Sequence, residues 1–343
     1  MPNRSRRRGF ALPAVLAVTG VVTLIFLVAI TALASLTAEA ASARARLRFT
    51  EAALTAEAEL AYIAATEPLR ERGWSIGGRR ATPFESDISP ETETGAVQRL
   101  ALDGSPYRTA GPHPLLVAVQ DQGGTINLSY ASPEVLNRVL ERSGVDQTER
   151  SRLLARYQDY TDADALRQIN GAESPDYGGG APPNRPLRRP GEWLSILGMR
   201  EAVDSADWRR IRPALSVDPS SSAINLNTLS PTALELLFDL TPTQAAAVVR
   251  QREVAPFRSL DAVTAAAGTA LPIDLEQTYL FPTGRMIYTI RDTRSAWVYR
   301  ARLTLDPSNR ERPLWIDQTE QTEAPGRAAA RITDAAEFPT PTR

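Results

Sequence analysis

The strongest hydrophobic pattern lies at the N-terminus of the chain. From Phe10 to Leu36 there are 27 residues without a charge, and from Ala40 to Ala65 the sequence continues without glycine or proline. Ala, Leu, Arg and Glu dominate the second stretch, and these are strong helix formers. At 1.5 Å per residue the apolar run makes a helix about 40 Å long, enough to cross a bilayer. The pattern predicts one helix over residues 10–67, with residues 10–36 in a membrane.

The charges around this run predict its orientation. Four arginines (Arg4, Arg6, Arg7 and Arg8) precede it, and the first charge after it is Glu39. Basic residues stay on the cytoplasmic side of a membrane, so a short cytoplasmic N-terminus is expected. The alternative is an ordinary secretory signal peptide cleaved near Ala34 or Ala40. However, the apolar region of a signal peptide is usually about 7–15 residues long, much shorter than this run.

Shorter alternating or apolar runs predict strands on both sides of a central helical region. They cover residues 96–102, 115–120, 286–291, 297–305 and 313–316. Period-two alternation and strand-length apolar runs bounded by turn residues are typical of β-structure. Residues 319–343 are polar and interrupted by proline, which predicts a disordered tail.

The central region contains a repeat with an offset of 98 residues. Thr125-Ile126-Asn127-Leu128 matches Ala223-Ile224-Asn225-Leu226, and each is followed by a Ser-Pro pair, Ser132-Pro133 or Ser230-Pro231. Serine at the cap with proline at the first helical position favours a helix start. Later landmarks, Leu187 to Gly198 and Phe257 to Gly268, match at an offset of 70, so the first copy carries 28 additional residues.

The second copy has the pattern of a helix-hairpin-helix over residues 234–268. Nucleic-acid-binding versions use glycine in the hairpin so that backbone amides reach a phosphate. Here the hairpin is Leu240-Thr241-Pro242-Thr243, without glycine, and Arg250, Arg252 and Arg258 are diluted by acidic neighbours. A packing role is favoured over DNA binding.

The additional residues of the first copy form an acidic loop, residues 159–185. Its carboxylates are Asp159, Asp162, Asp164, Glu173 and Asp176, followed by three consecutive glycines, residues 178–180. Clustered carboxylates are hard oxygen ligands that suit Ca²⁺. The spacing is not that of an EF-hand, since Arg167 stands where that loop requires glycine. A solvated acidic loop without metal is the alternative.

Composition excludes several classes of function. The 343 residues include 39 basic residues, all arginine, and 40 acidic ones, so no net charge attracts nucleic acid. There is neither lysine nor cysteine, which excludes Schiff-base lysines, thiolate nucleophiles and disulfides. The only histidine, His113, lies between two prolines, and no catalytic or phosphate-binding motif occurs. The chain is therefore not expected to be an enzyme.

The N-terminus resembles the type IV prepilin class in its short basic leader, its Gly9-Phe10 junction and its long helix. The resemblance implies that a prepilin peptidase removes residues 1–9 and that the new amino terminus, Phe10, is methylated. The fifth mature residue, usually Glu, is Ala14 here. That Glu normally neutralises the ammonium of a neighbouring subunit in lipid, so its absence favours a subunit with no neighbour above it.

The central motifs resemble the GspK family of type II secretion, the K-type minor pseudopilins. The resemblance rests on residues 120–128, 159–164, 170–173, 184–187 and 223–228, in the family's order. It implies an α+β fold, in which a pseudopilin (a long N-terminal transmembrane helix plus a small antiparallel sheet) carries a large inserted all-α domain that binds calcium. It also implies a tip position in the pseudopilus, initiation of its assembly in support of protein export across the outer membrane, and I-type and J-type minor pseudopilins as partners.

The expected organisation follows from these patterns and resemblances. The expected segments are a leader (1–9), the N-terminal helix (10–67), a first part of the sheet (68–124), the inserted helical domain (125–282), C-terminal strands (283–318) and the tail (319–343). The expected location is the bacterial inner membrane, with one span in lipid and a large periplasmic domain. Two other functions remain open: a minor pilin of a type IV pilus, and a membrane-anchored DNA receptor that uses the hairpin.

Overall fold

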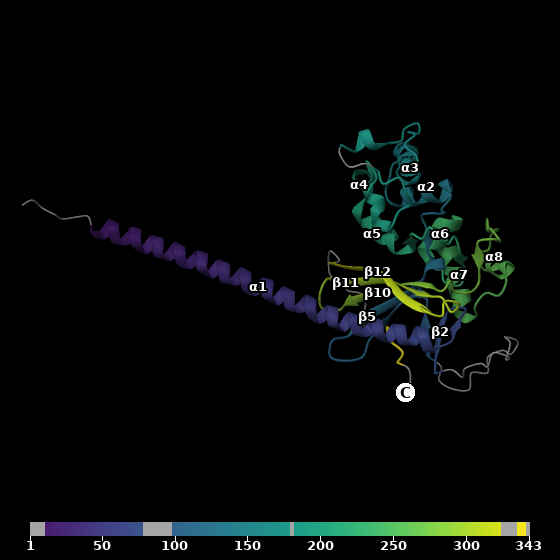
Figure 1. Cartoon of the computed structure of the whole chain (residues 1–343), viewed down its shortest axis with the longest axis horizontal. Coiled ribbons are helices and arrows are strands. Elements are labelled where there is room, and N and C mark those ends of the chain that lie inside the picture. Colours follow the sequence, from purple (N-terminus) through teal and green to yellow (C-terminus); the bar gives the residue numbers. More distant parts are fainter. Residues whose placement is uncertain (1–10, 78–97, 179–181, 324–334, 341–343) are drawn as a thin grey trace, which may run out of the picture. The chain divides into compact units, whose positions relative to one another are not determined.

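The N-terminal helix α1 runs from Ala11 to Thr66, close to the predicted range. The computed structural model describes residues 11–77, 98–178, 182–323 and 335–340, and the chain divides into two compact units between Leu54 and Thr55. In the first unit, α1 exposes large apolar side chains such as Leu12, Phe26 and Leu36. The helix is long and apolar enough to cross a membrane, in agreement with the prediction (Figure 1).

A six-stranded sheet organises the second unit, in the order β12-β11-β10-β5-β4-β13. Neighbouring strands are antiparallel except for β13, which pairs parallel to β4. The strands are β4 (Asp103–Arg108), β5 (Leu115–Asp121), β10 (Arg285–Asp292), β11 (Trp297–Leu305), β12 (Leu314–Glu323) and β13 (Ala336–Glu337). A smaller antiparallel sheet contains β1 (Leu69–Arg70), β2 (Gly73–Ile76) and β3 (Gln98–Ala101).

The last turns of α1 are fixed to the six-stranded sheet within this unit. Leu60 and Ile63 are fully buried, and the carboxylate of Glu57 accepts hydrogen bonds from the hydroxyls of Tyr288 on β10 and Tyr299 on β11. Burial and the nearby Glu57 carboxylate raise the pKa of both tyrosines, which keeps their hydroxyls as donors.

The helical region lies between β5 and β10. It contains α2 (Pro133–Arg142), α3 (Gln147–Thr161), α4 (Met199–Ala202), α5 (Ser205–Ile211), α6 (Pro231–Phe238), α7 (Pro242–Val254) and α8 (Leu260–Ala267). Short 3₁₀ turns, η1 (Gln122–Gly124), η2 (Ser174–Tyr177), η3 (Pro190–Ser195) and η4 (Arg212–Ala214), connect them. Figure 1 shows α2–α5 in one group and α6–α8 in another. The predicted α+β class, a long helix and an antiparallel sheet with an inserted helical region, is confirmed.

The repeat is visible in the local structure. In the first copy (residues 125–222), β6 (Ile126–Asn127) pairs parallel with β7 (Leu215–Ser216). In the second (residues 223–282), β8 (Ile224–Asn225) pairs parallel with β9 (Thr278–Tyr279). The Ser132 hydroxyl accepts from Val135 N at 3.4 Å and caps α2, and the Ser230 hydroxyl accepts from Ala233 N at 3.1 Å and caps α6.

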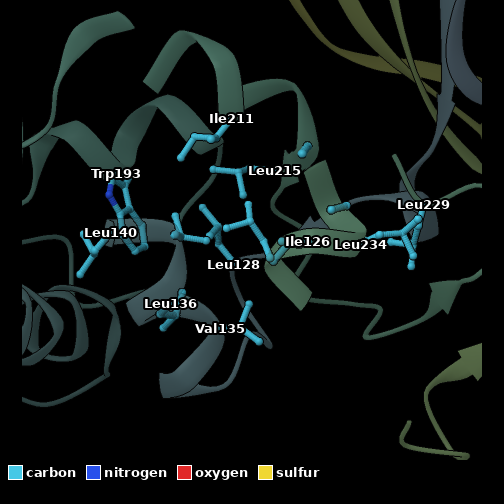
Figure 2. Close-up of a cluster of buried hydrophobic side chains, with 14 of the residues drawn as sticks. Ile126, Leu128, Val135, Leu136, Leu140, Trp193, Ile211, Leu215, Leu229 and Leu234 are labelled. Atoms are coloured by element: carbon cyan, nitrogen blue, oxygen red, sulfur yellow. The ribbon is translucent and has the colours of Figure 1, made fainter. Parts of the chain in front are cut away.

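Both copies contribute to one hydrophobic core. Leu187 and Phe257, equivalent landmarks in the repeat, are both buried in it. Figure 2 shows side chains of the first copy, including Leu128 and Trp193, in the same cluster as Leu229 and Leu234 of the second. A side chain as large as Trp193 with no exposed surface makes the core a substantial source of stability.

The helical region begins and ends at neighbouring strands. Asp121, the last residue of β5, lies opposite Met286 near the start of β10. Its fully buried carboxylate accepts from Asn225 Nδ2 (2.8 Å), Thr228 Oγ1 (2.9 Å) and both N and Oγ1 of Thr283 (3.1 and 2.7 Å). Burial raises the pKa of Asp121, and these donors oppose the rise by stabilising the carboxylate.

The C-terminal prediction needs correction. The strand predicted over 313–316 is β12, which starts at Leu314 and continues to Glu323 because residues 314–317 and 320–323 pair with β11. The predicted disordered tail is therefore wrong for the described residues 319–323 and 335–340. There β13 pairs with β4 and Phe338 is buried. Polar residues suffice in these strands because the ladder hydrogen bonds do not depend on side-chain polarity.

Candidate metal centre

The acidic loop connects α3 to η3, and the ends of short helices position its carboxylates. Asp159 is in the last turn of α3, and Asp162 is the residue that ends this helix. Glu173 immediately precedes η2, which contains Asp176. Asp164 lies in the exposed segment between the two helices.

Asp159 and Glu173 are the buried carboxylates of this loop, with 0% and 4% of their surface exposed. Both oxygens of Asp159 accept from Gln168 N, at 3.2 and 3.3 Å. Gly171 packs directly against Asp159, where any Cβ would collide with Oδ2. Glycine at this position is therefore required for the loop to close over Asp159.

Several buried oxygens of the loop have no hydrogen-bond donor. Among the described residues, seven buried side-chain oxygens lack a partner, and four of them belong to this loop. They are Oδ1 of Asp162, both carboxylate oxygens of Glu173, and Oδ1 of Asn184. Buried acceptors without a donor are costly, and carboxylate and amide oxygens are ligands that a hard cation takes.

The electrostatics of the loop also favour a cation. Burial raises the pKa of Glu173, and the nearby Asp159, Asp162 and Asp164 raise it further. The pKa of Asp162 is raised by burial and then by Asp164 and Asp159. Four of the five predicted carboxylates thus repel one another at neutral pH.

The fifth predicted carboxylate, Asp176, is engaged differently. Its Oδ2 accepts from Glu173 N at 3.0 Å, and its Oδ1 lies 3.4 Å from Arg167 Nη1. Arg167 also donates from Nε to the carbonyl of Gly171 at 3.2 Å. The Asp176 carboxylate is therefore already paired with the Arg167 guanidinium and with the backbone N–H of Glu173.

Asn184 is a residue that the sequence prediction did not include among the ligands. Its Nδ2 donates to the carbonyl of Asp164, so its buried Oδ1 is held beside the acidic loop. Its backbone has a positive φ of 43°, which asparagine tolerates better than most residues. An asparagine closing an acidic segment, in the motif 184–187, was the available signal.

The donor chemistry of this group fits Ca²⁺, which takes carboxylate and amide oxygens in flexible geometry. In the part of the chain that the structure describes, no three acidic or histidine side chains already form a compact ion site. Binding of one ion by three of these carboxylates would therefore require them to come closer together.

The other predicted sites lie elsewhere. Gly9 and Phe10 are outside the described residues, and Ala14 is exposed within the apolar part of α1. In the helix-hairpin-helix, Arg252 is buried, and its Nη1 donates to the carbonyls of Leu229 (2.6 Å) and Leu226 (3.4 Å). This arginine is used for packing and is not available to a phosphate.

Comparison with known families decides the identity of the helical region. Two family models match, one over residues 116–220 and one over residues 224–280, and both describe protein K of the type II secretion system (T2SS). Residues 116–220 and 224–280 therefore match the type II secretion protein K family. The resemblance to the GspK minor pseudopilins is confirmed.

The two protein K models divide the chain where the repeat does. The first ends at residue 220 and the second begins at residue 224, on either side of the boundary between the two copies. The first model contains the acidic loop, and the second contains the helix-hairpin-helix.

A curated relative of this chain is "Type II secretion system protein K" of Pseudomonas aeruginosa, 29% identical over 170 residues. The match covers 47% of this chain and 51% of the relative, so it spans about half of each protein. A crystal structure of the GspK-GspI-GspJ complex from enterotoxigenic Escherichia coli is similar with a TM-score of 0.48 and 16% identity. That similarity covers 64% of this chain and 84% of the solved one.

Proposed function

We propose that this protein K chain is the subunit at the tip of a type II secretion pseudopilus, where it initiates assembly. The observation that carries the proposal is the family match of the helical region. Membrane anchoring is supported by the apolar helix α1. The proposed role is mechanical: the helix packs with other pseudopilin helices in the inner membrane, and the second unit forms the periplasmic head.

The proposed partners are the I-type and J-type minor pseudopilins, with prepilin peptidase as the processing enzyme. The arginines before Phe10 support a cytoplasmic N-terminus. The mature chain should begin at Phe10 and stay in the membrane. N-terminal mass spectrometry that found a start after Ala34 or Ala40 would support a signal peptide instead.

A substitution in the membrane helix tests the tip position. Ala14→Glu would place a carboxylate in lipid with no subunit above to pair with it, at a cost of about 2.5–3.5 kcal/mol. We expect secretion by the bacterium that carries the gene to fall, while the head stays folded. The matched control is Ala14→Gln, which has the same length without the charge. Secretion at the wild-type level in the Glu variant would contradict the tip position.

The phenotype of a deletion strain distinguishes a secretion subunit from a minor pilin of a type IV pilus. Deletion of the gene should abolish protein secretion and leave pilus-dependent motility intact. Loss of motility with normal secretion would favour the minor pilin. Loss of DNA uptake alone would favour the receptor, although the burial of Arg252 argues against it.

We also propose that the acidic loop holds Ca²⁺ as a structural ion. The proposal is carried by the four buried oxygens without donors at Asp162, Glu173 and Asn184, supported by the mutual repulsion of the carboxylates. The ion would fix the loop to the end of α3, and its binding energy would add to folding stability.

Calorimetric titration of the chelator-treated full chain tests this ion. We expect Ca²⁺ uptake by the wild type and none by the double variant Asp162→Ala, Glu173→Ala. Asp274→Ala with Glu276→Ala, exposed carboxylates of the second copy, is the control and should bind as the wild type does. No uptake by the wild type at millimolar Ca²⁺ would establish a solvated loop.

A further inference from the structure

A cavity of about 680 Å³ lies between the helical region and the six-stranded sheet. Its lining comes from η3, α4 and the end of the acidic loop on one side, and from β11 and β12 on the other. Seven arginines line it, but among the described lining residues the acidic ones are Glu192 and Glu320 alone. The cavity is therefore strongly cationic.

Three of these arginines already have carboxylate partners. Nη2 of Arg185 lies 2.9 Å from Oε1 of Glu192, and Nη2 of Arg212 lies 3.3 Å from Oε2 of Glu320. Arg302 makes a two-pronged contact with Asp317, at 2.8 and 2.9 Å. Both glutamates of the lining are thus used within the protein.

The other four arginines have no ion pair or side-chain hydrogen bond within the described residues. Arg188, Arg189 and Arg200 are exposed, whereas Arg300 on β11 is half-buried. Burial, followed by repulsion from Arg212, lowers the pKa of Arg300 to about 10. A guanidinium that is partly removed from water beside another cation would gain from an external anion.

The sheet is irregular at this cavity. The register of β11 with β12 shifts between Arg300 and Arg302, and Gln318 of the bulge has a positive φ of 51°. Gln318 and Thr319 line the cavity and have no partner in the register. Bulges re-aim side chains and interrupt strand pairing, often beside binding sites.

We propose that this arginine-lined cavity binds an extended acidic segment of a partner protein, presenting at least two Asp or Glu side chains. Guanidinium groups pair with carboxylates through two parallel hydrogen bonds. The four unpaired arginines come from three separate segments (residues 188–189, 200 and 300), so a ligand that reaches them all needs separated carboxylates. The volume suits a few residues of chain.

Fluorescence anisotropy of the full chain in neutral-lipid nanodiscs, at fixed Ca²⁺, tests the proposal. The probe is a fluorescein-labelled peptide in which Glu alternates with Gly. The reference peptide has Gln in place of Glu. We expect the Glu peptide alone to bind, more weakly as salt is raised. The double variant Arg200→Gln, Arg300→Gln should weaken binding by about ten-fold or more, because paired charges are lost.

Matched variants keep the result specific to the cavity. Arg188→Gln with Arg189→Gln should also weaken binding, and neither change disturbs an internal ion pair. Arg250→Gln with Arg258→Gln removes the same charge from exposed positions outside the cavity and should leave affinity nearly unchanged. Thermal unfolding of each variant confirms that it is folded.

Three outcomes would overturn the proposal. They are no binding of the Glu peptide, an equal loss in the Arg250 and Arg258 control, and binding of pyrophosphate or a single-stranded oligonucleotide in its place. The last outcome would assign the cavity to small anions or to nucleic acid. These binding measurements do not require secretion, so their outcome is independent of the tests of the tip position.

Discussion

The two copies of the repeat bury charges of opposite sign. The second copy buries the guanidinium of Arg252 and supplies carbonyl oxygens of Leu226 and Leu229 as acceptors. The first copy buries the carboxylate of Glu173 and supplies no donor to either oxygen. The buried guanidinium of the second copy thus has carbonyl acceptors for its Nη1 but none for its Nε, whereas neither oxygen of the buried carboxylate in the first copy has a donor. The difference is consistent with the ion proposed above for the additional residues of the first copy.

Removing the internal charge of the second copy should have the largest effect. Arg252→Ala would leave a cavity and two carbonyls without their donor, and we expect a loss of about 2–5 kcal/mol in the free energy of unfolding. Urea unfolding of the full chain in detergent measures this loss. Arg250→Ala, on the exposed side of the same helix, is the control and should cost less than about 0.5 kcal/mol. Equal effects of the two substitutions would show that the buried contacts are unimportant.

Removing the proposed ion should affect the first copy alone. At a Ca²⁺ concentration about 100 times the dissociation constant, the ion would stabilise what it binds by about 2.7 kcal/mol. Hydrogen exchange in residues 159–178 should therefore be slower with Ca²⁺ than with chelator. Exchange in residues 223–282 should be the same in both conditions. Protection spread evenly over both copies would mean that the ion acts on the whole fold and not on the loop.

The smallest expected effect is a pH dependence that Ca²⁺ suppresses. The pKa of Glu173 is raised in the folded state, chiefly by burial, so the folded chain holds its proton more tightly than the unfolded chain. The stability from this proton is present at low pH and is lost as pH rises from the ordinary glutamate pKa through the raised one. In chelator, the melting temperature of the wild type should therefore fall across that window more than that of Glu173→Gln. With Ca²⁺ the Glu173 contribution should vanish. The same slope in both proteins would remove Glu173 as its source.

Local signals made much of this fold predictable. The apolar run gave α1, the Ser-Pro pairs gave the starts of α2 and α6, and alternation gave β11 with its observed bounds. Each of these signals acts over a few neighbouring residues, because capping and periodicity are properties of a single element.

Features that depend on distant partners were not predictable. The polar end of β12 is ordered because it pairs with β11, and β13 because it pairs with β4, more than two hundred residues earlier. In the sequence, Arg252 cannot be told from an arginine on the protein surface. Only the structure shows that its side chain is buried. At the acidic loop, the carboxylates could be predicted. Asn184 gave only the weak signal of an asparagine that closes the acidic segment, because its role depends on how the loop closes against Asp164.

The connection between the helical region and the sheet has a mechanical consequence. The helical region leaves from β5 and returns to β10, so a pull on it relative to the sheet is carried by these two strands. The pull would fall first on the pair Asp121–Met286 and would open the ladder one residue at a time. Asp121 lies at that point. Its carboxylate accepts hydrogen bonds from Thr283, just before β10, and from Asn225 and Thr228 of the second copy. The Asp121 side chain thus connects both chain segments where they leave the sheet, so it would resist separation of the helical region from the sheet under a pulling force.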